Sequence, residues 1–176
     1  VKLVVLDPVM VATSGDRLIA PETVQVLVEE LFPLATVVTP NLDEAALLLG
    51  RPIADAGQLD AAARDLLALG AQAVLLKGGH LPGDEVADLL VSGDGPAQRL
   101  ASPRIASRNT HGTGCTLSSA VAAYLALGQP LEQAVAKARS YILQAIAMGA
   151  DVYTGAGHGP LNHSHAPLAL HKRPRD

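Results

Sequence analysis

Apolar residues occur along this chain either in short uninterrupted runs or at helical spacing. Residues 3–6 and 73–76 are uninterrupted apolar runs, typical of strands buried on both faces of a parallel sheet. Residues 35–38 predict another short strand, which lies between these two in the sequence. Residues 86–92 and 98–105 flank a Gly-Asp-Gly-Pro turn and predict a pair of neighbouring strands.

Stretches with helical spacing alternate with these strands. The predicted helices cover residues 21–31, 41–49, 55–69, 115–127 and 130–148, and proline or glycine marks several of their ends. Residues 151–176 have no periodicity and predict an irregular tail. This order predicts one α/β domain over residues 1–176, with a mostly parallel, doubly wound sheet and helices on both faces.

Composition narrows the function classes. Of the 176 residues, 49% are hydrophobic and 17% charged, which is typical of a globular chain. The net charge of −4 argues against a nucleic-acid partner, and no apolar run reaches membrane-spanning length. A single cysteine excludes an internal disulfide and fits a reducing compartment, so the cytoplasm is the expected location.

Polar residues follow the predicted strands at one end. Asp7 closes the first strand, Asn41 and Glu44 follow the second, and Lys77-Gly78-Gly79 follows the third. Ligands bind beyond the carboxyl ends of strands in α/β sheets. If the crossovers are right-handed, the helix start around Cys115 lies on the same rim.

That helix start, residues 110–117, contains two glycines, three hydroxyls and the only cysteine. Gly112 and Gly114 allow close backbone approach, so the unpaired N–H groups could cradle an anion, and Cys115 would have its thiolate favoured there. The alternative is an ordinary turn before a helix, with a small buried cysteine. Neither the dinucleotide-binding glycine pattern nor a P-loop is present.

The other polar residues also allow two interpretations. Asp7 could start an Asp-Pro turn or hold a hydrated magnesium ion. Asn41 and Glu44 have capping-box spacing, which is compatible with Glu44 also positioning magnesium through water. Lys77 could be a solvated strand end or a point charge on a phosphate. An anion cradle, a lysine and two acids together favour phosphoryl transfer, with Cys115 taking the proton of the acceptor hydroxyl.

Five stretches carry a family resemblance. They are residues 6–12 with Ser14-Gly15, residues 39–45, Leu76-Lys77-Gly78-Gly79-His80, residues 111–120, and Gly157-His158-Gly159-Pro160-Leu161-Asn162-His163. The chain resembles the ribokinase-like superfamily, and within it the hydroxymethylpyrimidine/phosphomethylpyrimidine kinases of thiamine biosynthesis. The resemblance implies ATP-dependent phosphorylation of 4-amino-5-hydroxymethyl-2-methylpyrimidine and then of its monophosphate.

The resemblance also implies roles for individual residues. Gly112, Thr113 and Gly114 would form the anion hole over the transferred phosphoryl group, and Cys115 occupies the catalytic-base position. The implied cofactors are ATP and Mg²⁺. Asp7 and Glu44 would serve the magnesium site, and the implied ATP-binding residues are Lys77, Gly78, Asn41 and Thr39. The implied partners are the pyrimidine and ATP, and a homodimer is possible.

The family pattern begins with roughly a hundred residues that this sequence lacks, most of one domain's length. That segment holds a glycine-rich loop and much of the pyrimidine pocket. We therefore expect this chain to be the C-terminal two-thirds, with the nucleotide-binding and catalytic end, and to be inactive alone. The alternatives are a pyridoxal kinase, a hydroxyethylthiazole kinase or a non-catalytic binding module. The tail histidines His158, His163 and His165 could form a zinc cluster. We favour instead that the glycine-rich tail closes over the nucleotide.

Overall fold

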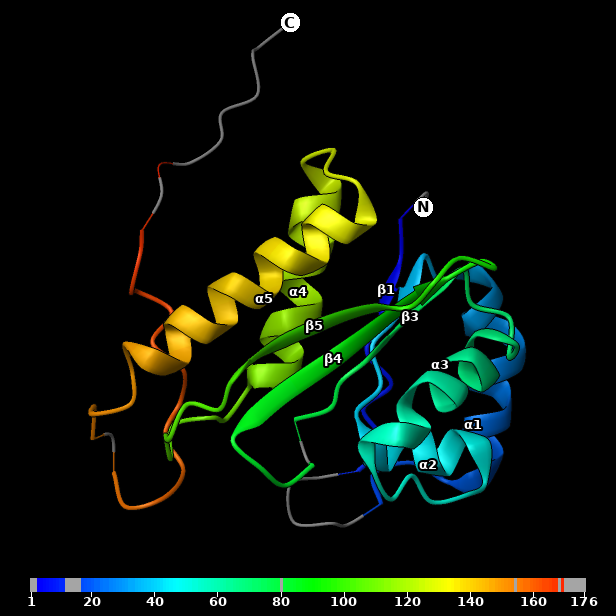
Figure 1. Ribbon diagram of the computed structural model, residues 1–176, viewed down its shortest axis with the longest axis horizontal. Helices are drawn as coiled ribbons and strands as arrows, with labels where there is room; N and C mark the ends of the chain where they lie inside the picture. Colours follow the sequence, from blue (N-terminus) through cyan, green and yellow to red (C-terminus); the bar gives the residue numbers. More distant parts are fainter. Residues whose placement is uncertain (1–2, 12–16, 80, 154, 168, 170–176) are drawn as a thin grey trace, which may run out of the picture.

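The computed structural model describes residues 3–11, 17–79, 81–153, 155–167 and 169. A five-stranded sheet, in the order β1-β2-β3-β4-β5, lies between two groups of helices (Figure 1). The parallel strands are β1 (Val5–Leu6), β2 (Val37–Val38) and β3 (Ala73–Leu76). The hairpin of β4 (Glu85–Ser92) and β5 (Gln98–Pro103) adds two antiparallel pairings.

This architecture confirms the α/β class with helices on both faces, but the sheet is mixed rather than mostly parallel. The difference arises because β1 and β2 have two residues each, whereas the predicted hairpin supplies the longest strands. A tight turn can join only antiparallel neighbours, so the hairpin reverses the strand direction at this edge.

One face of the sheet is covered by the first helices of the chain. They are α1 (Pro21–Val26), the π-helical η1 (Leu27–Leu31), the 3-10 turns η2 (Phe32–Leu34) and η3 (Ala56–Gln58), α2 (Leu42–Leu49) and α3 (Leu59–Leu67). The opposite face is covered by α4 (Thr113–Ala126) and α5 (Leu131–Ala147) (Figure 1).

β3 shows why both faces need helices. All four of its residues are buried, with Val74 and Leu76 in the α2–α3 core and Ala73 and Leu75 in the α4–α5 core. Successive side chains of a strand point to opposite faces, so an uninterrupted apolar run needs cover on both. This is the pattern that the sequence predicts for residues 73–76.

Several predicted helices are divided. Pro33 lies in η2, where the helix that begins at Pro21 tightens and ends, because proline lacks the N–H donor that would continue the helical hydrogen bonds. The predicted helix 55–69 divides into η3 and α3. Gly50 ends α2 with a φ of 65°, as predicted for a glycine after the last turn.

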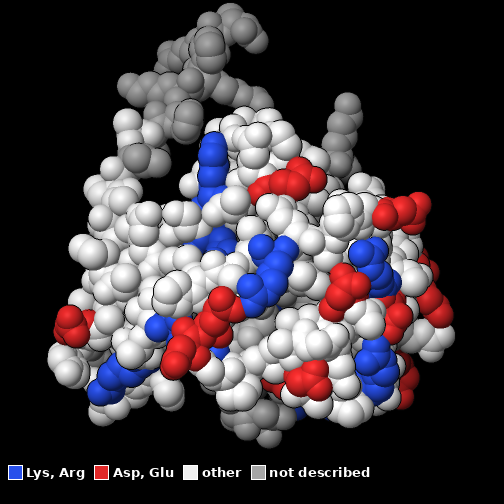
Figure 2. All heavy atoms as spheres, viewed as in Figure 1, with Lys and Arg blue, Asp and Glu red and all other residues white. Residues whose placement is uncertain are grey.

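Acidic and basic side chains alternate over the face shown in Figure 2, where no single sign dominates. Arg64 pairs with Asp60 at 3.0 Å, and Arg99 pairs with Glu85. No described helix is long and apolar enough to cross a membrane. Ala12, Ser14, Gly15 and His80 of the resembling stretches, and residues 154, 168 and 170–176 of the tail, lie outside the described residues.

Candidate functional site

The rim of the site is formed by three residues that each follow a strand directly. Asp7 follows β1, Thr39 follows β2 and Lys77 follows β3. The Lys77 ammonium lies 2.9 Å from Asp7 Oδ1, and the Thr39 hydroxyl donates to the same oxygen at 2.8 Å. The Asp7 and Lys77 side chains are 13% and 14% exposed, so the pair is sheltered but open to a ligand.

Asn41 and Glu44 form the predicted capping box at the start of α2. Asn41 Oδ1 accepts from the Glu44 N–H at 2.9 Å, and Glu44 Oε2 accepts from the Asn41 N–H at 2.8 Å. The Lys77 N–H donates to the Pro40 carbonyl at 2.9 Å, which joins this turn to the end of β3. The cap therefore holds a carboxylate beside the Asp7–Lys77 pair.

Glu44 is only 2% exposed, and its burial raises the pKa of the carboxyl group above the ordinary value of 4.5. The backbone donor at Asn41 and the charge of Lys77 oppose this rise, while the negative charge of Asp7 adds to it. A nearby cation would favour the ionised form, so the electrostatics of this corner suit a positively charged ligand.

This raised pKa predicts a pH-dependent stability. The folded chain holds a proton on Glu44 over a pH window in which the unfolded chain has lost it, so stability falls as pH rises from 4.5 through the raised pKa. Glu44→Gln keeps an oxygen acceptor for the cap but cannot ionise. We expect the stability of wild type relative to this variant to decline across that window. Urea unfolding of both proteins in EDTA, from pH 4 to 8, measures the difference, and a flat or rising difference would contradict the prediction.

The start of α4 lies next to the Asp7–Lys77 ion pair. Gly112 precedes the helix with a φ of 84°, and no side chain caps the first N–H groups, although the N–H of Thr113 donates to the Thr110 carbonyl at 3.3 Å. A Cβ on Gly114 would lie 3.2 Å from Lys77 Nζ and 3.8 Å from Asp7 Oδ2. Thr113 is tied back by its hydroxyl, which donates to the Thr110 carbonyl at 2.7 Å. Cys115 is exposed at the third position of the helix.

The structure thus brings most of the predicted site residues together. Asp7, Thr39, Lys77 and Gly114 meet at one rim, and the Asn41–Glu44 cap adjoins it. Gly78 leaves the rim and runs against β4, where its N–H donates to Asp88 Oδ1 at 3.0 Å.

Sequence reasoning missed several polar residues around this rim. Ser118, one turn after Gly114, donates to the Cys115 carbonyl at 3.0 Å, and its hydroxyl lies 3.5 Å from Asp7 Oδ2. Asp88 and Arg139 form a buried ion pair beneath Gly78. In the sequence, Asp88 is a charge within an apolar strand and Arg139 is an arginine among apolar helix positions. These two positions could have indicated a buried ion pair.

The tail is joined to the loop before α4. The buried Asn109 amide donates to the carbonyls of Gly149 and Val152 at 2.6 Å, and a Cβ on Gly159 would overlap its Oδ1. The His111 N–H donates to the Gly159 carbonyl at 3.2 Å. The tail therefore supports the loop that leads into the Gly112–Gly114 turn.

The tail histidines contact different partners. His158 lies 3.4 Å from the Arg108 carbonyl, whereas His163 and His165 both contact Tyr141. Within the described part of the chain, no group of three or more His, Cys, Asp or Glu side chains could hold a metal ion. The contacts give no support to a zinc cluster in the tail.

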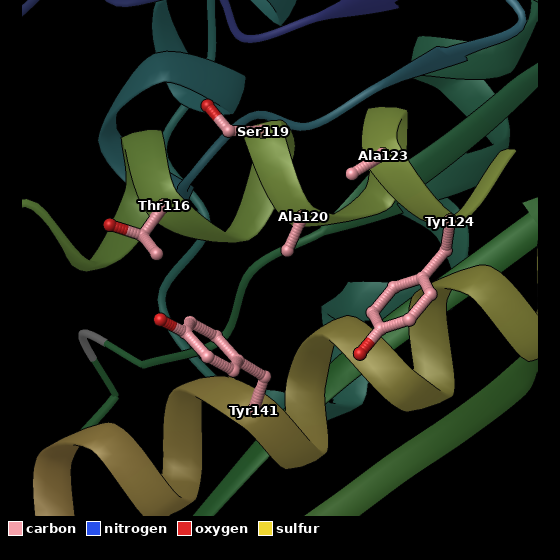
Figure 3. Close-up of a pocket in the computed structure, with 6 residues that line it drawn as sticks. All are labelled: Thr116, Ser119, Ala120, Ala123, Tyr124 and Tyr141. Carbon is pink, nitrogen blue, oxygen red and sulfur yellow. The ribbon is translucent and has the colours of Figure 1, made fainter. Parts of the chain in front are cut away.

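A separate hollow of about 300 Å³ lies between α4 and α5. Figure 3 shows the hollow with Tyr141 of α5 facing Thr116 of α4. The lining residues are Thr116, Ser119, Ala120, Ala123, Tyr124 and Tyr141. None of these side chains is charged, so the hollow offers no counter-charge to a phosphate.

A kinase family accounts for this combination of fold and site. The family model described as phosphomethylpyrimidine kinase matches residues 1–162, and the chain belongs to this family. A hydroxymethylpyrimidine/phosphomethylpyrimidine kinase from Rhizobium meliloti is 53% identical over 165 residues, covering 93% of this chain and 62% of the relative. The Escherichia coli protein of the same name is 45% identical over 164 residues, 93% of this chain and 61% of its own.

Solved structures agree with this membership. The pyridoxal kinase from Staphylococcus aureus in complex with AMP-PCP superposes with a TM-score of 0.84 at 34% identity, over 93% of this chain and 59% of that one. A phosphomethylpyrimidine kinase from Clostridium difficile gives a TM-score of 0.68 at 38% identity, over 82% and 58%. The chain spans about three fifths of the length of the curated relatives described above.

Proposed function

We propose that this chain forms the nucleotide-binding and catalytic part of an ATP-dependent kinase that phosphorylates 4-amino-5-hydroxymethyl-2-methylpyrimidine and then its monophosphate. The observation that carries this proposal is the approach of the uncapped α4 start to the Asp7–Lys77 pair, within a chain that belongs to the phosphomethylpyrimidine kinase family. We also propose that residues 1–176 form a single ribokinase-like domain, because both helix layers pack on one sheet.

The chemistry of the rim suits a nucleotide with magnesium. Mg²⁺ binds through one or two carboxylates, phosphate oxygens and several waters rather than through an all-protein cage. Asp7 and Glu44 provide two such carboxylates and would hold the ion. When bound, Mg²⁺ neutralises charge that develops on the transferred phosphoryl group. Lys77 would release Asp7 and hold the ATP phosphates. Thr39, Asn41 and Gly78 would line the nucleotide side next to it, with the Gly78 N–H kept on Asp88.

The start of α4 would carry out the transfer. The N–H groups around Gly112, Thr113 and Gly114 would hold the oxygens of the transferred phosphoryl group, where the positive end of the helix dipole favours negative charge. Cys115, exposed beside them, would accept the proton of the attacking hydroxyl as a general base. Ser118 holds the first turn of this helix through the Cys115 carbonyl.

The test is ADP release by the complete gene product with three acceptors: the hydroxymethylpyrimidine, its monophosphate and pyridoxal. Pyridoxal is the second candidate, because Staphylococcus aureus pyridoxal kinase has a TM-score of 0.84 with this chain. We expect both pyrimidines to be phosphorylated with a higher kcat/KM than pyridoxal. Turnover with pyridoxal alone would replace the proposal, and no turnover with any acceptor would favour a binding module.

A further inference from the structure

Two buried charges lie beneath the rim. Asp88 in β4 is 7% exposed and Arg139 in α5 is 8% exposed, and Arg139 Nε lies 2.9 Å from Asp88 Oδ2. Arg139 Nη2 also donates to the Val86 carbonyl at 2.9 Å and to the Ser102 hydroxyl at 3.0 Å. The guanidinium therefore joins α5 to both strands of the hairpin.

The other carboxylate oxygen of Asp88 binds the backbone that follows Lys77. Asp88 Oδ1 accepts the N–H of Gly78 at 3.0 Å in a buried hydrogen bond. Gly78 lies opposite Ala87 if the β3–β4 register is continued, and a Cβ there would overlap the Ala87 carbonyl oxygen. The backbone directly after Lys77 is therefore held against β4 by a carboxylate whose own position is set by Arg139.

Stability alone is a weak reason for this arrangement. Taking two charges out of water carries a large desolvation cost, and apolar residues of similar volume often stabilise a fold as well or better. A buried carboxylate with both oxygens engaged does, however, define the position of its partners. One of these partners is the Gly78 N–H, in the peptide that follows Lys77. The Lys77 ammonium itself lies 2.9 Å from Asp7 Oδ1 at the rim.

We propose that Asp88 and Arg139 are a positioning pair, which fixes the Gly78 backbone and so aims the Lys77 ammonium at the phosphates of a bound nucleotide. This inference rests on the proposed function, because it assigns the pair to the phosphate side of the same site. It predicts that the pair affects nucleotide affinity rather than acceptor affinity.

The test compares variants of the complete gene product. Asp88→Asn leaves one oxygen acceptor for two donors, Gly78 N–H and Arg139 Nε. We expect it to weaken MgADP binding by about tenfold to a hundredfold, because a misplaced Lys77 ammonium loses a hydrogen bond to a charged phosphate, which contributes about that factor. In the double variant Asp88→Asn/Arg139→Leu the oxygen is available to Gly78 but no guanidinium sets its position, so MgADP affinity should stay below that of wild type, and full recovery would overturn the role of Arg139.

Ile142→Ala is the matched control. Ile142 is a buried residue of α5, three positions after Arg139, and it packs in the α4–α5 core. This substitution should lower the melting temperature but leave the Kd for MgADP within about twofold of wild type, because affinity depends on groups at the site rather than on the global free energy of unfolding. An equal loss of affinity in Ile142→Ala would overturn the positioning role.

Amide hydrogen exchange at Gly78, measured without ligand, tests the pair independently of turnover. We expect slow exchange in wild type and Ile142→Ala, and faster exchange in Asp88→Asn. Unchanged exchange or unchanged MgADP affinity in Asp88→Asn would overturn the inference. A wild type that binds MgADP without phosphorylating any acceptor would overturn the proposed function alone, and one that does not bind MgADP would overturn both.

Discussion

Cys115→Ala should lower the rate of phosphoryl transfer by about 10²–10⁴-fold, the usual contribution of a general base. MgADP affinity should stay within a few-fold of wild type. Cys115 is exposed at the third position of α4, whereas the charged groups proposed to bind nucleotide are Asp7, Glu44 and Lys77. Removal of the sulfur should therefore affect the proton transfer and leave nucleotide binding largely intact.

Single-turnover kinetics of the complete gene product, together with MgADP titration, measures both effects. Thr116→Ala is the control, because its side chain lines the hollow between α4 and α5 and has no role assigned to it in the transfer. This neighbouring substitution in the same helical turn should change the rate little. A Cys115→Ala variant that turns over at the wild-type rate would exclude the catalytic-base role.

Lys77→Met should raise the KM for MgATP by about tenfold to a hundredfold, the usual loss when a hydrogen bond to a charged group is removed. The pyrimidine KM should change little. Methionine keeps much of the side-chain length but removes the ammonium that lies 2.9 Å from Asp7. The nearby Glu44 would also lose a favourable charge, so its pKa should rise further.

Steady-state kinetics with each substrate varied in turn distinguishes these effects. Arg64→Met is the control, because it breaks the exposed Arg64–Asp60 ion pair on α3 and should leave both KM values unchanged. Melting temperatures accompany the kinetics, since the Lys77–Asp7 pair is largely buried. If Lys77→Met raises only the pyrimidine KM, Lys77 does not belong to the phosphate side.

The sequence by itself determined the features that depend on neighbouring residues. The apolar run at 73–76 forms a strand with the predicted bounds, because four buried positions in succession need cover on both faces. Asn41 and Glu44 form the predicted cap, because their three-residue spacing alone brings each side chain to the other's backbone N–H. The rim of Asp7 and Lys77 could also be anticipated, since both follow strands whose carboxyl ends share an edge.

Only the tertiary structure decided which distant groups meet. Lys77 pairs with Asp7 across 70 positions, and Ser118 approaches Asp7 across 111. Arg139 reaches Asp88 across 51 positions, through packing of α5 on the hairpin. Such contacts depend on helix packing and strand order, which local spacing does not encode. The tertiary structure also determines the chemistry of Glu44. The pKa of its carboxyl group is raised mainly because the fold buries it, and this desolvation does not depend on its neighbours in sequence.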